Sequence, residues 1–321
     1  MRVLLTGSSG LIGTALVDAL VGDGHLVTRL VRTVPAKATP AKGTPATGAN
    51  PGPDAVTDVA WDPARGTIDV DGLVAAGPFD GVVHLAGTGV GDKRWNPARK
   101  QLIRDSRNLS TTLLVDTLVA LPTPPPVLVS ASAVGFYGDR GDDVLDEESP
   151  AGTGFLADVC VAWERAAEPA AAAGIRTVLL RTGIVLSAHG GVLGKQLPLF
   201  RMGVGGKVGS GHQYRSWITL DDEVAAIIQC LVDETLAGPV NATAPAPATD
   251  AALAKALGAA LHRPSFFAVP APALKLVLGT EMATDMVLSS QRVLPAKLIA
   301  SGFAFAHTDL DEAVRSVLGP N

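Results

Sequence analysis

The feature that most restricts the fold is a short apolar run that leads directly into three evenly spaced glycines. Residues 3–5 predict a buried strand, and Gly7, Gly10 and Gly13 follow with GxxGxxG spacing before an apolar helix over residues 13–21. Gly7 permits a tight turn, Gly10 lets backbone approach a pyrophosphate, and Gly13 allows close helix–strand packing. Free backbone N–H groups and the positive helix end favour an anion there. The residues predicted to form this dinucleotide site are Thr6, Gly7, Ser9, Gly10, Leu11, Ile12 and Gly13.

Beyond this turn, short β-branched runs alternate with longer Ala- and Leu-rich stretches. Strands are expected over residues 25–31, 81–85, 127–130 and 177–180, and helices over 101–120 and 159–173. Such alternation predicts an α/β fold with a doubly wound, Rossmann-like parallel sheet. With 321 residues, 47% of them hydrophobic, the chain is long enough to bury a large core.

Two stretches depart from the alternation. Residues 33–57 are rich in Pro, Ala, Thr and Gly and have no Leu, Ile or aromatic residue, so we expect a mobile insertion there, with a binding lid as the alternative. The alternation weakens beyond Leu186. We therefore expect a dinucleotide-binding domain over 1–186 and a smaller C-terminal α/β substrate lobe over 187–321, in which 250–321 is a family-specific module, with the site in the cleft between the lobes.

Composition argues against several classes of protein. Lys and Arg number 26 against 31 Asp and Glu, and aromatic residues are few, which argues against a nucleic-acid partner. No apolar run approaches the ~20 residues of a membrane span. Cys160 and Cys230 lie far apart with no CxxC, so neither a disulfide framework nor a metal site is expected. We expect a soluble cytoplasmic protein.

The end of the second predicted strand bears on the choice of dinucleotide. NAD sites usually place an acidic residue there for the ribose 2′-hydroxyl, but this strand ends in Arg29-Leu30-Val31-Arg32, and the first acidic residue after it is Asp54. A guanidinium suits a 2′-phosphate, since it stays charged and can bind two oxygens. We predict NADP as the cofactor and Arg32 as its phosphate ligand; a solvated surface arginine is the alternative.

Several short sequence motifs follow later in the chain. They are 84–87 (HLAG), 130–138 (SASAVGFYG), 181–183 (RTG), 217–218 (WI) and 221–222 (DD). With the glycine turn, they resemble the extended short-chain dehydrogenase/reductase superfamily. The runs 91–95 (GDKRW), 105–107 (DSR), 209–213 (GSGHQ) and 289–295 (SSQRVLP) are similar to its atypical, NAD(P)-binding "epimerase family" branch. That branch carries a small C-terminal domain of unassigned role. The resemblance covers nearly the whole chain except 33–57.

The resemblance implies further cofactor contacts. Leu85, Ala86 and Gly87 would line the adenosine side of the dinucleotide, and the chain after the strand ending near Arg181 would pass the nicotinamide. Trp61 and Asp62 stand where related proteins place residues near the adenine. His84 is expected to be a buried strand residue.

The catalytic signature of the superfamily is missing. Its enzymes use a Tyr as acid/base and a Lys four residues later that lowers the tyrosine pKa. Tyr137 and Tyr214 are followed at that spacing by Gly141 and Ile218. Counted back from Glu164, the helix offers Leu156 and Cys160, or Phe155 and Val159 in a register shifted by one residue. Neither register supplies an acid/base.

Two candidate catalytic residues remain. Ser132 stands at the position of the superfamily's catalytic serine and would bind a substrate oxygen, or else cap the following turn. Tyr137 is a candidate replacement acid, or else packs against the next loop. Arg94, Trp95 and Lys100 would hold an anionic substrate, or form a solvated helix start.

Two functions are therefore open. One is an NADP(H)-dependent oxidoreductase or sugar-nucleotide epimerase-like enzyme with an unorthodox proton donor, acting on a small molecule such as a sugar nucleotide or another anionic carbonyl or hydroxyl compound. The other is a non-catalytic NADP(H)-binding redox sensor or scaffold. The sequence leaves the oligomeric state open.

Overall fold

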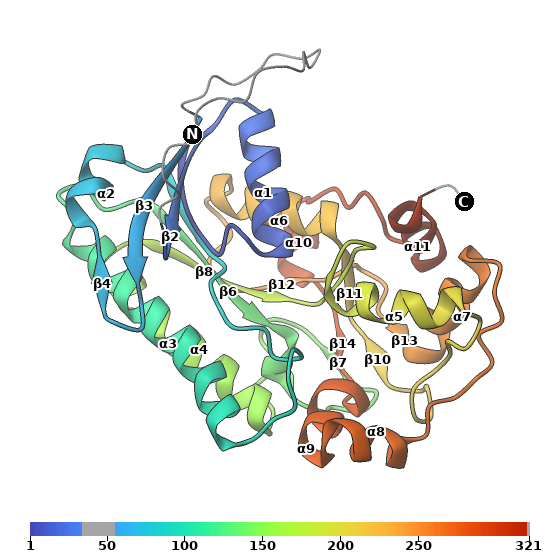
Figure 1. Ribbon diagram of the computed structural model, residues 1–321. Coiled ribbons are helices and arrows are strands. Elements are labelled where there is room, and N and C mark those ends of the chain that lie inside the picture. The colour runs from blue at the N-terminus through green and yellow to red at the C-terminus, as the bar shows by residue number, and fades with distance from the viewer. Residues whose placement is uncertain (34–54, 320–321) are drawn as a thin grey trace, which may run out of the picture.

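A twisted eight-stranded sheet forms the centre of the fold in a computed structural model that describes residues 1–33 and 55–319 (Figure 1). The strand order is β12-β8-β6-β5-β1-β2-β3-β4, and every neighbouring pair is parallel except β3 and β4. The strands are β1 (Arg2–Thr6), β2 (Leu26–Val31), β3 (Val56–Asp62), β4 (Thr67–Ile68), β5 (Gly81–His84), β6 (Val127–Ala133), β8 (Arg176–Thr182) and β12 (Gly238–Ala242). The doubly wound, Rossmann-like α/β fold predicted from the sequence is confirmed.

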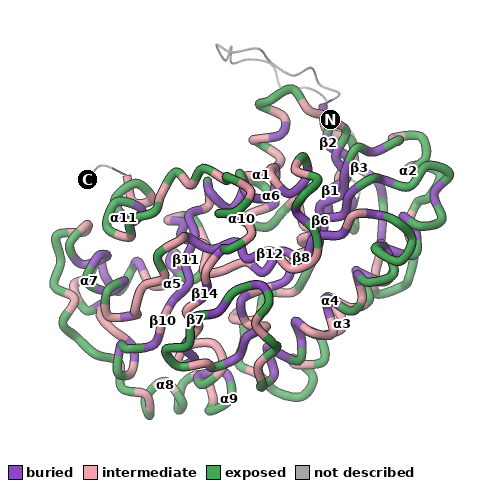
Figure 2. The backbone as a smooth tube through the Cα atoms, turned by 180° about the vertical axis from the view of Figure 1, so that it is seen from behind, coloured by how far each residue is buried: buried purple, intermediate pink, exposed green. Residues whose placement is uncertain are grey.

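Helices cover both faces of the sheet, because its strands are apolar on both sides. In β1, Val3 and Leu5 belong to one hydrophobic cluster and Leu4 to another, as the two-residue period of a strand requires. The helices α1 (Leu11–Gly22) and α6 (Leu220–Val232) close the first cluster. The helices α2 (Val70–Ala76), α3 (Pro97–Ala120) and α4 (Phe155–Ala172) close the second. Figure 2 shows that the strands are buried between these two layers of helices.

A smaller lobe adjoins the sheet and has its own core. The parallel pair β9 (Ile184–Leu186) and β11 (Trp217–Thr219) lies with α5 (Gly191–Arg201), α7 (Asp250–Ala260) and α11 (Leu310–Leu318) around a third cluster that includes Trp217 and Leu257. The remaining elements are β7 (Val144–Leu145), β10 (Tyr214–Arg215), β13 (Ala248–Thr249), β14 (Arg292–Val293), α8 (Ala271–Leu278), α9 (Thr280–Met282), α10 (Ala296–Ala300), and the short helices η1 (Val134–Tyr137) and η2 (Ala283–Leu288).

The chain crosses between the two lobes more than once. Beyond residue 186 it returns to the main sheet with α6 and β12 before it enters the last segment. The predicted division of the chain at residue 186 into a dinucleotide-binding domain and a C-terminal substrate lobe stays a prediction. No helix of the described residues is long and apolar enough to cross a membrane.

The predicted insertion over 33–57 ends too late by at least three residues. Ala55 is buried, and Val56 and Thr57 already belong to β3, where they pair with Val27 and Thr28 of β2. Their composition resembles the preceding Pro- and Thr-rich stretch, but a parallel strand at this position supplies hydrogen bonds that local composition does not indicate. Residues 34–54, on which the rest of the insertion prediction falls, lie outside the described part of the chain.

One carboxyl group is buried in the main sheet's helix layer with a single partner. Glu223, on α6, is completely buried; its Oε1 accepts a 2.8 Å hydrogen bond from the Thr182 hydroxyl, and its Oε2 has no partner among the described residues. Burial raises the pKa of Glu223 from 4.5 to about 8. The folded protein therefore carries this group protonated at neutral pH.

This protonation predicts a specific pH dependence of stability. The unfolded chain releases the Glu223 proton near pH 4.5, whereas the folded chain keeps it to about pH 8, so the free energy of unfolding falls as pH rises through that window. Glu223→Gln removes this component, and urea unfolding across the window should show a flatter pH profile for the variant. Glu168→Gln, at an exposed position of α4, is the control. Identical profiles for wild type and Glu223→Gln would contradict the assignment.

Candidate functional site

The glycine turn lies at the carboxyl edge of the sheet, where β1 ends and the strand order reverses between β1 and β5. Gly7 has a φ of +73°, and a Cβ at Gly7 would lie 2.7 Å from the Leu85 carbonyl. A Cβ at Gly13 would lie 2.2 Å from the Gly7 carbonyl oxygen. Backbone therefore packs directly on backbone here, and no side chain fits. Such a switch point is where open α/β sheets bind their ligands.

The first turn of α1 is open to an anion. Its cap residue, Gly10, has no side chain to accept from the helical N–H groups, and both Ser9 and Gly10 are exposed. Leu11 and Ile12 are half-buried, and a Cβ on Gly190 or Gly191 would lie 3.4 or 3.6 Å from the Leu11 side chain. Unsatisfied N–H groups at the positive end of a helix dipole bind phosphate groups. The cradle thus fits the dinucleotide pyrophosphate that the sequence predicts.

Thr6 fixes the segment that borders the glycine turn. Its Oγ1 accepts hydrogen bonds of 3.2 Å from the backbone N–H groups of Leu85 and Ala86 and lies 2.8 Å from Nδ1 of His84. Burial lowers the pKa of His84 to about 3, so its ring is neutral. Thr6 therefore positions the segment 85–87, in which Leu85 and Ala86 are half-buried and Gly87 is exposed.

The two arginines at the end of β2 differ in their partners. Arg29 forms a two-point ion pair with Asp58 on β3, with N···O distances of 2.7 and 2.8 Å. Arg32 is exposed and has no hydrogen bond or ion pair with any residue that the structure describes. The guanidinium that remains open to a ligand is therefore that of Arg32.

Trp61 and Asp62 end β3 beside this region. Trp61 is buried and meets the His84 ring edge to face, with centroids 6.3 Å apart. The Asp62 carboxylate accepts a 3.1 Å hydrogen bond from the Ala64 N–H and lies 3.4 Å from Nε of Arg65. Their predicted roles near the adenine stay predictions; in the structure Trp61 serves the core and Asp62 the following turn.

Ser132 belongs to a buried ion-pair network. Its hydroxyl donates a 2.6 Å hydrogen bond to Oε1 of Glu164 on α4. Glu164 in turn binds Arg181 of β8 at two points, 2.9 and 3.0 Å. All three side chains are at least nine-tenths buried. While this bond holds, the single Ser132 hydroxyl hydrogen is committed, and Ser132 can accept a hydrogen bond from a substrate but cannot donate one.

Tyr137 closes the other end of the network. Its hydroxyl donates to Oδ1 of Asn241 (2.7 Å) and accepts from Nη1 of Arg181 (3.0 Å), and its ring is completely buried. Burial raises the pKa of Tyr137, and the Arg181 charge offsets only part of the shift. The Arg181 guanidinium also stacks 3.5 Å from the centroid of Phe136. Tyr137 is thus a neutral phenol, and the Arg181 guanidinium is held by protein groups. Their predicted roles stay predictions.

The network reaches the last segment of the chain. The side-chain amide of Asn241 donates to the Leu294 carbonyl (2.9 Å), and the Glu147 carboxylate accepts from the backbone N–H groups of Asn241 (3.1 Å) and Lys297 (3.2 Å). Asp285 of η2 accepts from the Phe155 N–H at the start of α4 (2.9 Å). Sequence reasoning missed Asn241, Glu147 and Asp285, since no motif or spacing links positions so far apart in the chain.

The helix that carries the superfamily's Tyr–Lys pair holds no such pair here. Cys160, the second position in one of the two registers that the sequence leaves open, is buried, and burial raises the pKa of this thiol to about 12. Near the start of α3, Lys100 forms a 2.6 Å ion pair with Glu281 of α9 and lies over the Phe155 ring, while Trp95 Nε1 donates to the Val90 carbonyl. Among the described residues, no cluster of three His, Cys, Asp or Glu side chains is arranged to hold a metal ion.

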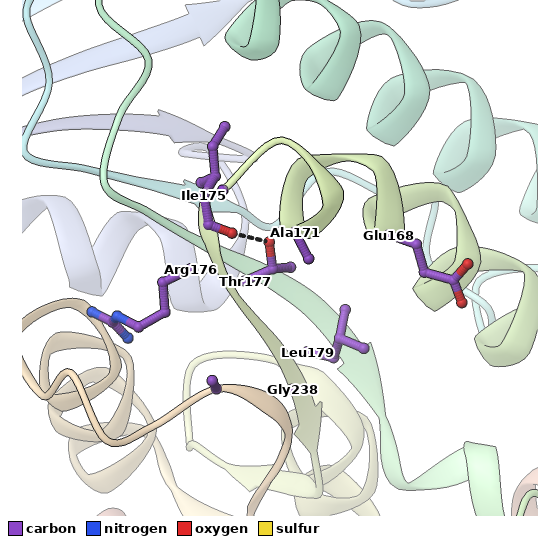
Figure 3. A pocket seen from close by; sticks show the side chains of 9 residues that line it. Glu168, Ala171, Ile175, Arg176, Thr177, Leu179 and Gly238 are labelled. Atoms are coloured by element: carbon purple, nitrogen blue, oxygen red, sulfur yellow. Dashed lines mark hydrogen bonds between the residues drawn. The ribbon is translucent and has the colours of Figure 1, made fainter.

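A hollow of about 370 Å³ lies at the opposite edge of the sheet (Figure 3). It is bordered by the beginnings of β8 and β12 and the end of α4, including Glu168, Ala171, Ile175, Leu179 and Gly238. The glycine turn lies at the carboxyl ends of the strands, so this hollow is not part of the candidate site.

Two protein-family models match separate parts of this chain. Residues 3–241 match the model of the "NAD dependent epimerase/dehydratase family", and residues 269–317 match a "domain of unknown function (DUF1731)". An epimerase family protein of Mycobacterium tuberculosis (strain CDC 1551 / Oshkosh) is 42% identical over 97% of this chain and 96% of its own length. A human epimerase family protein, SDR39U1, is 33% identical over 99% of this chain and 100% of its own.

Solved structures resemble the chain along its whole length. The crystal structure of human SDR39U1 (isoform 2) with NADPH has a TM-score of 0.82 and 31% identity, and covers 99% of both chains. A nucleoside-diphosphate sugar epimerase from Corynebacterium glutamicum has a TM-score of 0.77 and 36% identity; this chain spans 58% of its length. A UDP-glucose 4-epimerase complex with NAD from Thermus thermophilus, at 20% identity and a TM-score of 0.71, shares the fold.

The close packing at the glycine turn predicts a sharp contrast between two glycines of α1. Gly13→Ala would place a Cβ against the Gly7 carbonyl, so the turn must shift; titration calorimetry with NAD(H) and NADP(H) should show at least about tenfold weaker binding, with a lower melting temperature. Gly22→Ala, in the same helix, is the control, because a Cβ there has no neighbour within 4 Å. Equal coenzyme affinity in Gly13→Ala and wild type would show that the turn does not hold the dinucleotide.

Proposed function

Since the chain belongs to the NAD-dependent epimerase/dehydratase family, we propose that it is an NADP(H)-dependent oxidoreductase or epimerase-like enzyme. Its substrate class would be a small anionic carbonyl or hydroxyl compound, with sugar nucleotides the first to test. The observation that carries the proposal is the glycine cradle beside an exposed guanidinium that no described carboxylate neutralises. Hydride transfer is chemistry that the bound coenzyme supplies; the protein's part is to bind and orient it.

The preference for NADP(H) rests on Arg32. Its neighbour Arg29 is already paired with Asp58, so the two cations of this strand end are not equivalent. An open guanidinium attracts a 2′-phosphate and has no comparable partner in an unphosphorylated ribose. The NADPH named for the human SDR39U1 structure supports the same preference.

Proton transfer would depend on the buried network. Ser132 is oriented by Glu164, whose charge is balanced by Arg181, and this arrangement keeps the hydroxyl lone pairs available to a substrate donor. Tyr137 would act as an acid only if its bond to Asn241 opened.

A second candidate function is a non-catalytic NADP(H)-binding sensor or scaffold. It is favoured by one observation: the hydroxyl hydrogens of both Ser132 and Tyr137 are donated to buried protein acceptors.

The coenzyme preference can be tested at Arg32. In Arg32→Asp the 2′-phosphate meets a carboxylate in place of a guanidinium, so we expect the ratio of NADPH to NADH affinity to fall by at least about tenfold, since charge-assisted hydrogen bonds contribute about 1.5–3 kcal/mol. Calorimetry on protein freed of nucleotide measures both affinities. Arg315→Asp, on the exposed side of α11, gives the same charge change as a control. An unchanged ratio in Arg32→Asp would remove the phosphate assignment.

The two candidate functions can be separated by turnover. The enzyme predicts coenzyme oxidation or reduction with a member of a panel of carbonyl compounds and sugar nucleotides, and a lower kcat in Ser132→Ala and Tyr137→Phe with unchanged coenzyme affinity. Spectrophotometry at the nicotinamide absorbance measures the first, and calorimetry the second. Full turnover in both variants would reject these residues, and no turnover on any compound would favour the sensor.

A further inference from the structure

Arg107 is held in a defined position beside the dinucleotide cradle. It lies in the middle of α3, and its Nη1 donates to the carbonyls of Thr88 (2.9 Å) and Ile103 (3.1 Å). Its guanidinium lies 4.8 Å from the ring centroid of Trp163 on α4. A Cβ on Gly87 would lie 3.3 Å from the guanidinium carbon, so the glycine leaves room for it. The side chain is fixed from three sides.

The charge of Arg107 has no counterion among the described residues. The buried arginines Arg181 and Arg215 each pair with a carboxylate, but no ion pair of the described chain includes Arg107. Burial lowers the pKa of Arg107, and the nearby Arg99 cation adds to that effect. A guanidinium remains protonated even so, and desolvating a charge without a partner costs free energy. Such a cation is stabilised when an anion binds beside it.

The edge of the Arg107 guanidinium that carries Nε and Nη2 is unpaired. Two other arginines of this protein bind carboxylate side chains through the same edge. The Nε and Nη2 atoms of Arg107 have no hydrogen-bond partner among the described residues. Neither atom is fully enclosed by the protein, so a ligand can reach both. Arg29 and Arg181 use the same two atoms, Nε and Nη2, to hold the two oxygens of Asp58 and Glu164. Arg107 thus presents an unpaired Nε/Nη2 edge of the kind that Arg29 and Arg181 use to bind carboxylates.

The position of this edge assigns it to the candidate site. Gly87 continues the segment of Leu85 and Ala86, on which the glycine turn packs. Cys160, which one of the two open registers places at the superfamily's lysine position, lies near enough to Arg107 to influence its titration. We propose that Arg107 is a ligand-binding residue of this site, which binds an oxyanion through Nε and Nη2. The oxyanion is a phosphate of the dinucleotide or an acidic group of the substrate, and the inference rests on the proposed function.

The test compares Arg107→Gln with Arg104→Gln. Arg104 lies about one turn earlier on α3, over the Phe155 ring, and its replacement changes the charge equally. Calorimetry gives the affinities for NADPH and NADH, and then for inorganic phosphate on the NADP-loaded protein. Arg107→Lys keeps the charge but loses the two-point geometry, so its affinities should fall between those of wild type and Arg107→Gln. Circular dichroism confirms that each variant is folded.

We expect Arg107→Gln, but not Arg104→Gln, to weaken one class of ligand by at least about tenfold. If NADPH and NADH weaken equally, the oxyanion is the dinucleotide pyrophosphate; Arg32→Asp, in contrast, changes their ratio. If coenzyme binding is retained and phosphate binding is lost, the oxyanion belongs to a second ligand. Wild-type affinities of Arg107→Gln for all three probes would overturn the inference and leave the proposed function intact. A wild type that binds neither coenzyme would overturn the proposed function itself, and this inference with it.

Discussion

The close contact of backbone with backbone at Gly7 is the constraint on which the rest of the site depends. The Gly7 backbone lies close to the Leu85 carbonyl on one side and to Gly13 on the other, so that neither glycine has room for a Cβ. This contact brings the first turn of α1, without a capping side chain, to the edge where β1 and β5 diverge. The uncapped N–H groups of α1, the segment 85–87 and the end of β2 are then neighbours because the order of the strands in the sheet brings them together.

The second half of the site is organised by charge. The Glu164–Arg181 pair lies in an interior where isolated charges are costly, and each partner is satisfied by the other and by Ser132 or Tyr137. Arg32 and Arg107 differ from this pattern, because each has an unpaired edge among the described residues. Paired cations maintain the structure, and the unpaired ones mark the places where we infer negatively charged ligand groups.

Sequence reasoning predicted several strands of the sheet and the tight glycine turn because each is a local feature of the chain. The glycine spacing, the strand before it and the helix after it are adjacent in the sequence, and short β-branched runs predicted β2, β5, β6 and β8 of the main sheet. It placed the start of β3 too late, because Val56 and Thr57 are paired by β2 and not by their own composition. Sequence reasoning also could not identify the hydrogen-bond partners of Ser132 and Tyr137. Glu164 served only to count helix positions, and Asn241 is 104 residues from Tyr137.

The bond from Asn241 to Leu294 has a consequence for the autonomy of the C-terminal segment. The same asparagine accepts from Tyr137, and its backbone shares the Glu147 carboxylate with Lys297. Truncating the chain before this segment would leave the buried Asn241 side-chain N–H group without its Leu294 acceptor and the buried Glu147 carboxylate with only one of these two backbone donors. The segment that matches a separate family model is therefore joined to the sheet by buried hydrogen bonds, and we expect the two to unfold together.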